Sequence, residues 1–203
     1  MINKKRLIKT FTDLVKIDSE SRNEVDVARY IKNKLNKLGI KYKIDKSAVL
    51  TKSNHGNIIA KLGSKKNLPT ILLSSHMDTV TNGLGIKPVI KRDSITSDGR
   101  TILGADDKSG LAIILETLEI LKRKKLNHYN VEAAITTCEE IGLLGAKFLD
   151  YNLLNSREGI VLDSTSPERL VYKGPSSDYF NIIVQGVEAH SGINPEKGIS
   201  SIT

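Results

Sequence analysis

The sequence has few of the residues that mark several protein classes. It contains one cysteine, Cys138, which excludes an internal disulfide and makes the cytoplasm the expected location. No segment approaches the roughly 20 apolar residues of a membrane helix, so we expect no membrane partner. The N-terminus soon mixes acidic residues into its basic stretch and lacks a small-residue cleavage site, so we expect no signal peptide.

Aromatic residues are also scarce, at 4%, and tryptophan is absent, although the formal net charge is +8. Such a charge makes nucleic-acid binding a hypothesis. The lysines, however, are scattered over predicted helix faces and turns, and no aromatic residues alternate with them as a base-stacking platform requires. We therefore expect a solvated basic surface and no nucleic-acid partner. A steep salt dependence of RNA or DNA retention would favour the alternative.

What the sequence does contain is an alternation of helical and strand-like apolar patterns. Two helices are expected before residue 40, the second with a capping box at Ser21 and Glu24 and a terminating glycine at Gly39. A long helix is expected over 107–124 and a short one over 142–149. Strands are expected at 41–44, 57–62, 70–75, 131–138 and 159–163. This alternation predicts the α/β class, with a mixed, mostly parallel sheet sandwiched by helices.

The pattern changes near the C-terminus. Segments 169–174 and 178–186 are expected to be two strands, and 192–203 is expected to open a helix. We therefore predict a larger domain over residues 1–174 and the start of a smaller α+β domain over 175–203. A strand–strand–helix unit left unpaired would expose its apolar face, so we expect that the smaller domain is incomplete.

Acidic residues and histidine gather in four motifs, each at the end of a strand-like run. The motifs are ILLSSHMDTV (71–80), ILGADDKSG (102–110), AAITTCEEIG (133–142) and GIVLDS (159–164). In open α/β sheets, functional residues gather outside the carboxyl ends of the strands. Carboxylates brought that close repel one another unless cations lie between them. Together the motifs predict a site for divalent metals with imidazole and carboxylate ligands.

Each of these residues taken alone has a simpler explanation. His76 could be a hydrogen-bonded structural histidine, and Asp106 could cap the helix that follows it. The pair Glu139 and Glu140 could lie on a solvated face, and Asp163 could begin a turn. Their joint occurrence, in order and at strand ends, favours the metal site.

The motifs HMDTV, GADDKSG, CEEIGLLGAK, VLDS and EAHSGINPEKG resemble those of the peptidase T branch of the dinuclear zinc exopeptidases. Relatives with the same core include glutamate carboxypeptidases and aminoacylases. The resemblance implies a hydrolase of short peptides, as an aminopeptidase on tripeptides. It also implies that 1–174 is the catalytic domain, that 175–203 begins a lid or dimerisation domain, and that the full-length protein is a homodimer.

The resemblance further implies a ligand set for two Zn²⁺ ions, for which Co²⁺ or Mn²⁺ could substitute. The ligands would be His76, Asp106, Glu140 and Asp163. Asp106 would bridge both metals, and the peptide bond after it would be cis. Glu140 and Asp163 would be terminal ligands, one on each metal.

Three further residues receive catalytic roles from the same resemblance. Glu139 would be the general base that takes a proton from water and passes it to the leaving amine. Asp78 would accept the second ring N–H of His76 and fix its tautomer. His190 would approach the site and help to stabilise the oxyanion. Cys138, in contrast, is expected to be a small buried side chain and not a nucleophile, since no cation adjoins it.

Full-length members of that branch supply a last histidine ligand near their C-terminus, which these 203 residues do not contain. One of the two metals would then have only Asp106, Glu140 and water. We therefore expect weaker metal binding and little or no turnover from this chain alone. An inactive, truncated or degenerate metal-binding or interaction module is the alternative function, and the intact Glu139, Asp78 and His190 argue against it.

Overall fold

The structure, a computed structural model, describes residues 2–63, 68–164, 166, 168–174, 176 and 180–202. It divides into two compact units, Met1–Thr165 and Ser166–Thr203. The elements of the first unit are α1 (Lys4–Val15), α2 (Val25–Lys37), β1 (Lys41–Ile44), α3 (Ala48–Thr51), β2 (Ile58–Leu62), β3 (Thr70–His76), β4 (Val89–Ile90), β5 (Ile95–Thr96), α4 (Ala105–Lys124), β6 (Asn130–Thr136), α5 (Leu144–Lys147), the 3-10 helix η1 (Tyr151–Leu153) and β7 (Glu158–Val161). The predicted domain boundary at 174/175 lies inside the second unit and stays a prediction.

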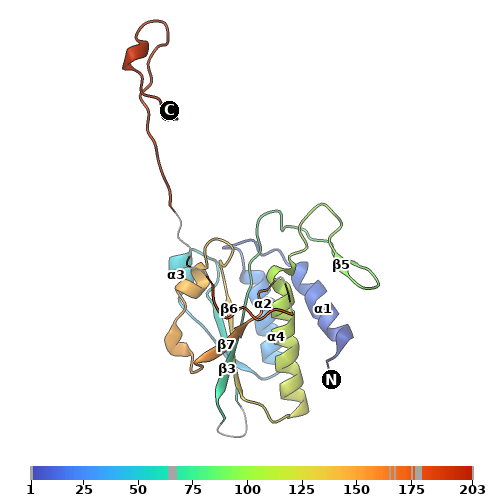
Figure 1. Ribbon diagram of the computed structural model, residues 1–203. Helices are drawn as coiled ribbons and strands as arrows, with labels where there is room; N and C mark the ends of the chain where they lie inside the picture. The colour runs from blue at the N-terminus through green and yellow to red at the C-terminus, as the bar shows by residue number, and fades with distance from the viewer. Residues whose placement is uncertain are drawn as a thin grey trace. The chain divides into compact units, whose positions relative to one another are not determined.

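The main sheet of the first unit has the order β1-β2-β6-β3-β7, which Figure 1 shows as a twisted layer. β3 runs parallel to β6 and to β7. β2 is antiparallel to β6, and β1 is antiparallel to β2. The predicted α/β fold with a mixed sheet is confirmed, and each predicted strand of this unit forms within two residues of its expected bounds.

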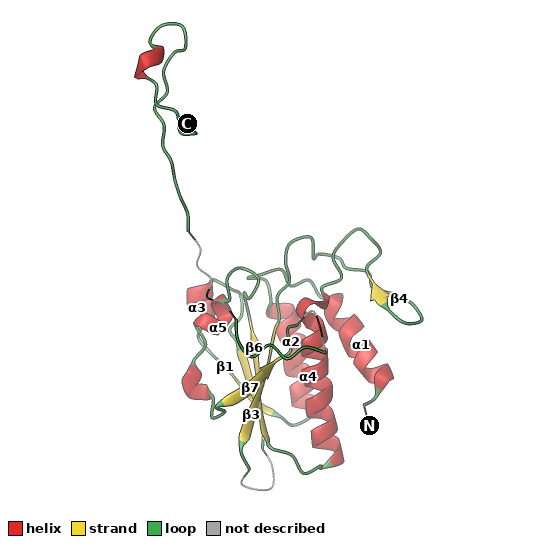
Figure 2. Ribbon diagram, viewed as in Figure 1, coloured by secondary structure: helices red, strands yellow, loops and turns green. Residues whose placement is uncertain are grey.

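Helices cover both sides of this sheet. Figure 2 shows α1, α2 and α4 together on one side and the short α3 and α5 on the other. α4 packs on β3 and on α1, and Arg6 of α1 forms ion pairs with Glu116 (2.6 Å) and Glu119 (3.0 Å) of α4. The core between these helices and the sheet includes Leu14, Val27, Ile31, Leu35, Ile58, Leu111, Ile114, Leu118 and Ile135. Among the described residues, no helix is both long and apolar enough to cross a bilayer.

β6 is the central strand, and every residue after Asn130 in it is buried. Its one acidic residue, Glu132, is only 2% exposed. The carboxylate of Glu132 pairs with Lys61 Nζ (2.7 Å) on β2 and accepts the backbone N–H groups of Asn155 and Ser156. The hydroxyl of Ser156 donates to it as well (2.9 Å). This buried carboxylate is therefore fully supplied with donors by the chain itself.

The predicted capping box at the start of α2 is wrong. Glu24 is the N-cap residue, but its side chain makes no capping hydrogen bond. Ser21 Oγ donates instead to Asp78 Oδ2 (2.6 Å), and Glu24 Oε1 accepts the backbone N–H of Cys138 (3.0 Å). Both side chains leave the helix end because distant, buried groups offer them partners, and such tertiary contacts override a local pattern. Gly39 does end the helix region as predicted, with a φ of 60°.

The described part of the second unit contains little regular structure. The predicted strands at 169–174 and 178–186 are absent from it, and residues 178 and 179 lie outside the described residues. An isolated antiparallel bridge joins Val187 to Ile199, and the predicted helix is a single 3-10 turn, Pro195–Lys197. The apolar residues of these segments are exposed, so no packed surface stabilises them as strands.

Candidate metal centre

The parallel strands bring the four sequence motifs to one edge of the sheet. His76 is the last residue of β3, and Asp163 follows β7 closely. Asp106 lies in the first turn of α4, and Glu139 and Glu140 follow β6. Because β3, β6 and β7 run in the same direction, their carboxyl ends adjoin. We call these five side chains the acid–histidine cluster.

His76 lies at the centre of the acid–histidine cluster and is only 2% exposed. Its Nε2 atom lies 3.1 Å from Asp106 Oδ1, 3.7 Å from Glu139 Oε2 and 3.9 Å from Asp163 Oδ2. One imidazole nitrogen therefore faces three carboxylates from three different elements. Carboxylates this close to one another repel, and a cation placed between them would relieve that repulsion.

Two groups of side chains in the cluster have the spacing of metal ligands. The groups are His76, Asp106 and Glu140, and His76, Glu139 and Asp163; in each, one ligand atom per residue lies within 4.8 Å of the others. The donors are one imidazole and several carboxylates, a set that zinc accepts. The predicted ligands are thus together in space, although the structure groups Asp163 with Glu139. Which residue binds which metal stays a prediction, as do the catalytic roles.

Three carboxyl groups of the cluster have raised pKa values. Burial raises the pKa values of Glu139, Glu140 and Asp163, and the charges of neighbouring carboxylates raise them further. Burial of His76 disfavours its cation, but the hydrogen bond and charge of Asp78, with Glu139 and Asp106, outweigh it and raise its pKa to about 9. The site therefore favours additional positive charge, either protons or metal cations.

Asp78 is fully buried and connects two parts of the cluster. Its Oδ1 accepts the backbone N–H of Glu139 (3.0 Å), and its Oδ2 accepts that of Glu140 (3.2 Å). His76 Nδ1 lies 3.0 Å from the backbone oxygen of Asp78 and 3.4 Å from its Oδ1. His76 Nδ1 therefore lies nearer to the carbonyl oxygen of Asp78 than to its carboxylate, and the predicted role of Asp78 in fixing the tautomer stays a prediction. Asp78 also orients the turn that carries both glutamates, which the sequence did not indicate.

Lys108 is a buried cation beside the site that sequence reasoning missed. It is 1% exposed and donates to Ser19 Oγ (2.5 Å) and to the backbone oxygen of Met77. Burial outweighs the attraction of Asp78 and Glu24 and lowers its pKa to about 7. Lys108 thus connects the start of α4 to the loop between His76 and Asp78. The peptide bond between Asp106 and Asp107 is cis, as the resemblance implied.

Two other sequence predictions concern Cys138 and His190. Cys138 is fully buried, and burial together with the charge of Glu24 raises the pKa of its thiol to about 12. It is therefore unsuited to act as a thiolate nucleophile. His190 lies exposed in a turn of the second unit, where its Nδ1 accepts the backbone N–H of Gly192 (3.1 Å). Its predicted role at the oxyanion stays a prediction.

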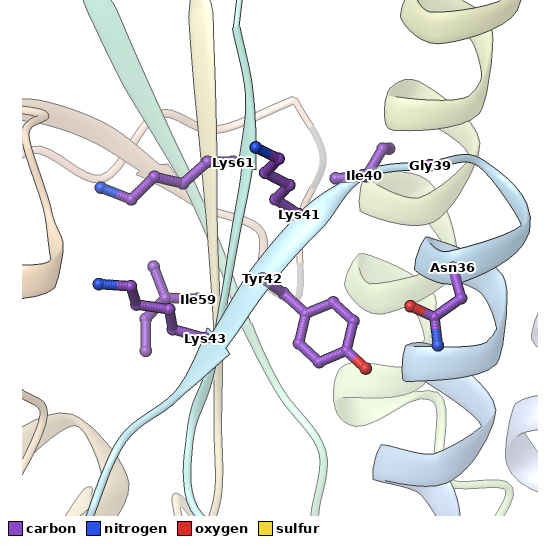
Figure 3. Close-up of a pocket in the computed structure, with 8 residues that line it drawn as sticks. All are labelled: Asn36, Gly39, Ile40, Lys41, Tyr42, Lys43, Ile59 and Lys61. Carbon is purple, nitrogen blue, oxygen red and sulfur yellow. The ribbon is translucent and has the colours of Figure 1, made fainter.

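A separate pocket lies beside β1, a strand at the side of the sheet (Figure 3). It is lined by Asn36, Gly39, Ile40, Lys41, Tyr42, Lys43, Ile59 and Lys61. The close-up shows Lys41, Lys43 and Lys61 pointing to one side of β1 and Tyr42 to the other. None of these residues belongs to the acid–histidine cluster, so the pocket gives no support to the predicted chemistry.

The sheet order and the acid–histidine cluster define an α/β domain of the zinc exopeptidase type. The model of peptidase family M28 matches residues 57–188, which include the whole cluster. The chain belongs to this peptidase family.

The similar proteins agree with that assignment. The chain is 41% identical to the uncharacterized protein YqjE of Bacillus subtilis (strain 168), over 100% of this chain and 55% of that protein. A tripeptidase from Staphylococcus aureus subsp. aureus Mu50 has a similar structure, with 42% identity and a TM-score of 0.79 over 82% of this chain and 45% of the other. The aminopeptidase PepT from Bacillus cereus ATCC 10987 gives 39% identity and a TM-score of 0.79 over 99% of this chain and 54% of the other. The peptidase T-like resemblance is thus confirmed, and the chain spans about half the length of these relatives.

Proposed function

We propose that this chain carries the metal-binding part of the catalytic domain of an exopeptidase that hydrolyses short peptides. The observation that carries the proposal is the convergence of His76 with acids from three other segments at one sheet edge. Similar structures that are described as a tripeptidase and as an aminopeptidase support the finer proposal of an aminopeptidase acting on tripeptides. The free, buried cysteine supports a cytoplasmic location.

The metals in this proposal are two Zn²⁺ ions held by His76, Asp106, Glu140 and Asp163, with Co²⁺ or Mn²⁺ as substitutes. When bound, such ions lower the pKa of a water molecule and polarise the scissile carbonyl. The crowded carboxylates support this choice, because their charges need cations among them.

Glu139 is the proposed general base. Its carboxylate reaches into the cluster, with Oε2 3.7 Å from His76 Nε2, while Asp78 holds its backbone N–H. In the metal-free chain, burial and neighbouring acids raise its pKa. A carboxylate in this position could take a proton from water and pass it to the leaving amine. Asp78 positions both His76 and Glu139. His190 as an oxyanion donor and homodimerisation of the full-length protein complete the proposal, on the resemblance alone.

Metal loading and hydrolysis can be separated by one substitution. The unmodified chain and its Glu139→Gln variant are stripped of metal, titrated with Zn²⁺ by calorimetry, and assayed on a free tripeptide and its N-acetylated form. We expect both to bind zinc, and any cleavage of the free tripeptide to fall about 100-fold or more in the variant, as loss of a general base does. Glu158→Gln, an exposed glutamate on β7, is the control and should change neither property. Absence of zinc binding by the unmodified chain would refute the proposal.

A further inference from the structure

Two buried carboxylates bind three successive backbone N–H groups at the turn after β6. Glu24 Oε1 accepts the N–H of Cys138 (3.0 Å). Asp78 then accepts the next two, those of Glu139 (3.0 Å) and Glu140 (3.2 Å). The side chains of those two glutamates belong to the acid–histidine cluster, so the backbone just before them determines where they point.

The backbone at Cys138 requires such an anchor. Cys138 has a φ of 53°, in the left-handed region that few residues other than glycine adopt. Here the chain leaves the extended course of β6 and reverses, which aims the residues that follow. Without a partner for its buried N–H, this conformation would lose a hydrogen bond in addition to its backbone cost.

Glu24 is itself held firmly, although it is 0% exposed and distant in sequence from the turn. Its Oε1 also accepts the backbone N–H of Arg22 (3.0 Å), and its Oε2 accepts the hydroxyl of Ser53 (2.5 Å). Its side chain does not cap α2. The thiol of Cys138 also donates to Glu24 Oε1 (3.4 Å), so this buried carboxylate supplies acceptors to four groups and fixes the position of each.

We propose that Glu24 is a positioning residue for the reaction proposed above: through the Cys138 N–H it aims Glu139 and Glu140 at His76. The inference rests on the proposed function, because positioning Glu139 and Glu140 matters for catalysis only if they take part in that reaction. The anchoring of the turn, however, can be measured without metal or substrate, by hydrogen exchange of the Glu139 and Glu140 amides, which donate to Asp78 and not to Glu24.

The test compares Glu24→Leu, which removes both acceptor oxygens, with Glu24→Gln, which keeps one and can donate to Ser53. The matched control is Glu132→Leu. Glu132 is also a buried glutamate, and it also accepts two backbone N–H groups and one serine hydroxyl, but those groups precede β7. Two quantities are measured in each protein: the hydrogen-exchange rates of the Glu139 and Glu140 amides in the metal-free chain, and the dissociation constant for Co²⁺.

We expect the Glu139 and Glu140 amides to exchange about tenfold faster in Glu24→Leu than in Glu132→Leu at matched unfolding free energy, because only the first loosens the turn. We expect Glu24→Leu to bind Co²⁺ about 10- to 100-fold more weakly, as loss of a residue that orients a ligand does. Glu24→Gln should restore both values to within about threefold of the unmodified chain, since a neutral acceptor retains most of a hydrogen bond.

Equal exchange rates and equal Co²⁺ affinities in Glu24→Leu and Glu132→Leu would overturn the proposal. If Glu24→Leu does not fold, hydrogen exchange of the unmodified chain decides: the Cys138 amide should exchange slowly, and exchange at the rate of an exposed loop amide would overturn the proposal. Failure of the proposed function gives a different result. In that case the unmodified chain binds no Co²⁺, while the exchange contrast still shows whether Glu24 anchors the turn.

Discussion

Carboxylates lie near both ends of β6, and their surroundings shift their pKa values in opposite directions. Near its start, burial of Glu132 raises the carboxyl pKa, but hydrogen bonds from Lys61 and from residues 155 and 156 outweigh burial and lower it. Beyond its other end, burial and like charges raise the pKa values of Glu139 and Glu140 together. The first carboxylate has all its partners within the chain. Protons or cations would relieve the repulsion in the second pair, and acids with pKa values raised in this way are typical of functional sites.

The largest effect is expected from the loss of His76, the only imidazole of the acid–histidine cluster. His76→Ala should weaken Zn²⁺ binding by at least about a hundredfold, because even residues that merely orient a ligand contribute up to that amount. Calorimetric titration at pH 7 measures it. Glu132→Leu, at the other end of β6, should leave the zinc affinity within about threefold, since no group it touches belongs to the cluster. A similar loss of zinc affinity in both variants would mean that the two ends of β6 do not differ in function.

The next effect is on stability. Glu132→Leu should lower the free energy of unfolding by about 2 kcal/mol at pH 7, because two backbone N–H groups and a hydroxyl lose their buried acceptor. Urea denaturation with EDTA present measures the difference. A variant as stable as the unmodified chain would show that water replaces those partners.

The same substitution has a pH dependence with a definite sign. The pKa of Glu132 is lower in the folded chain than its ordinary value of about 4. Its ionised form therefore stabilises the fold above that ordinary value, and this contribution is lost as the pH falls through the folded-state pKa. The stability difference between the unmodified chain and Glu132→Leu should be constant from neutral pH to about pH 5 and shrink below pH 4.

The smallest effect has the opposite sign. Asp163→Asn removes one of the crowded charges, so the metal-free chain should become more stable, by less than about 1 kcal/mol because water screens a side chain that is 30% exposed. Urea denaturation in EDTA and again in excess Zn²⁺ measures it. In zinc the substitution should destabilise the chain, since an amide is a weaker ligand. A loss of stability in EDTA would contradict the view that the site carries surplus negative charge.

Much of the fold and of the cluster could be predicted because the relevant patterns are local. Each strand of the main sheet is a short apolar run, and each acid follows such a run directly, so topology alone brings His76 and Asp163 to one edge. The contacts that orient them could not be predicted in this way. Glu24 and Lys108 act on residues 114 and 31 positions away, and nothing in their sequence neighbourhood indicates that they are buried.

The difference between local sequence patterns and contacts made by distant residues also explains the predictions that were wrong. Ser21 and Glu24 fit a capping box, yet both side chains bind buried groups far along the chain. Segments 169–174 and 180–186 have strand-like composition, but in the described residues they lack a paired neighbour or a packed face. The local sequence favours a particular strand or helix cap, but contacts with distant parts of the chain decide whether it forms.

The position of β6 in the sheet also determines when the sheet can assemble during synthesis. β6 lies between β2 and β3, although both precede it in the chain. A nascent polypeptide that ends before Asn130 can pair β1 with β2 but has no strand to join them to β3. The backbone N–H and C=O groups along the edges of β2 and β3 that β6 will pair with then stay unpaired until the ribosome has released β6. That interval is when this chain is most exposed to aggregation and to chaperones.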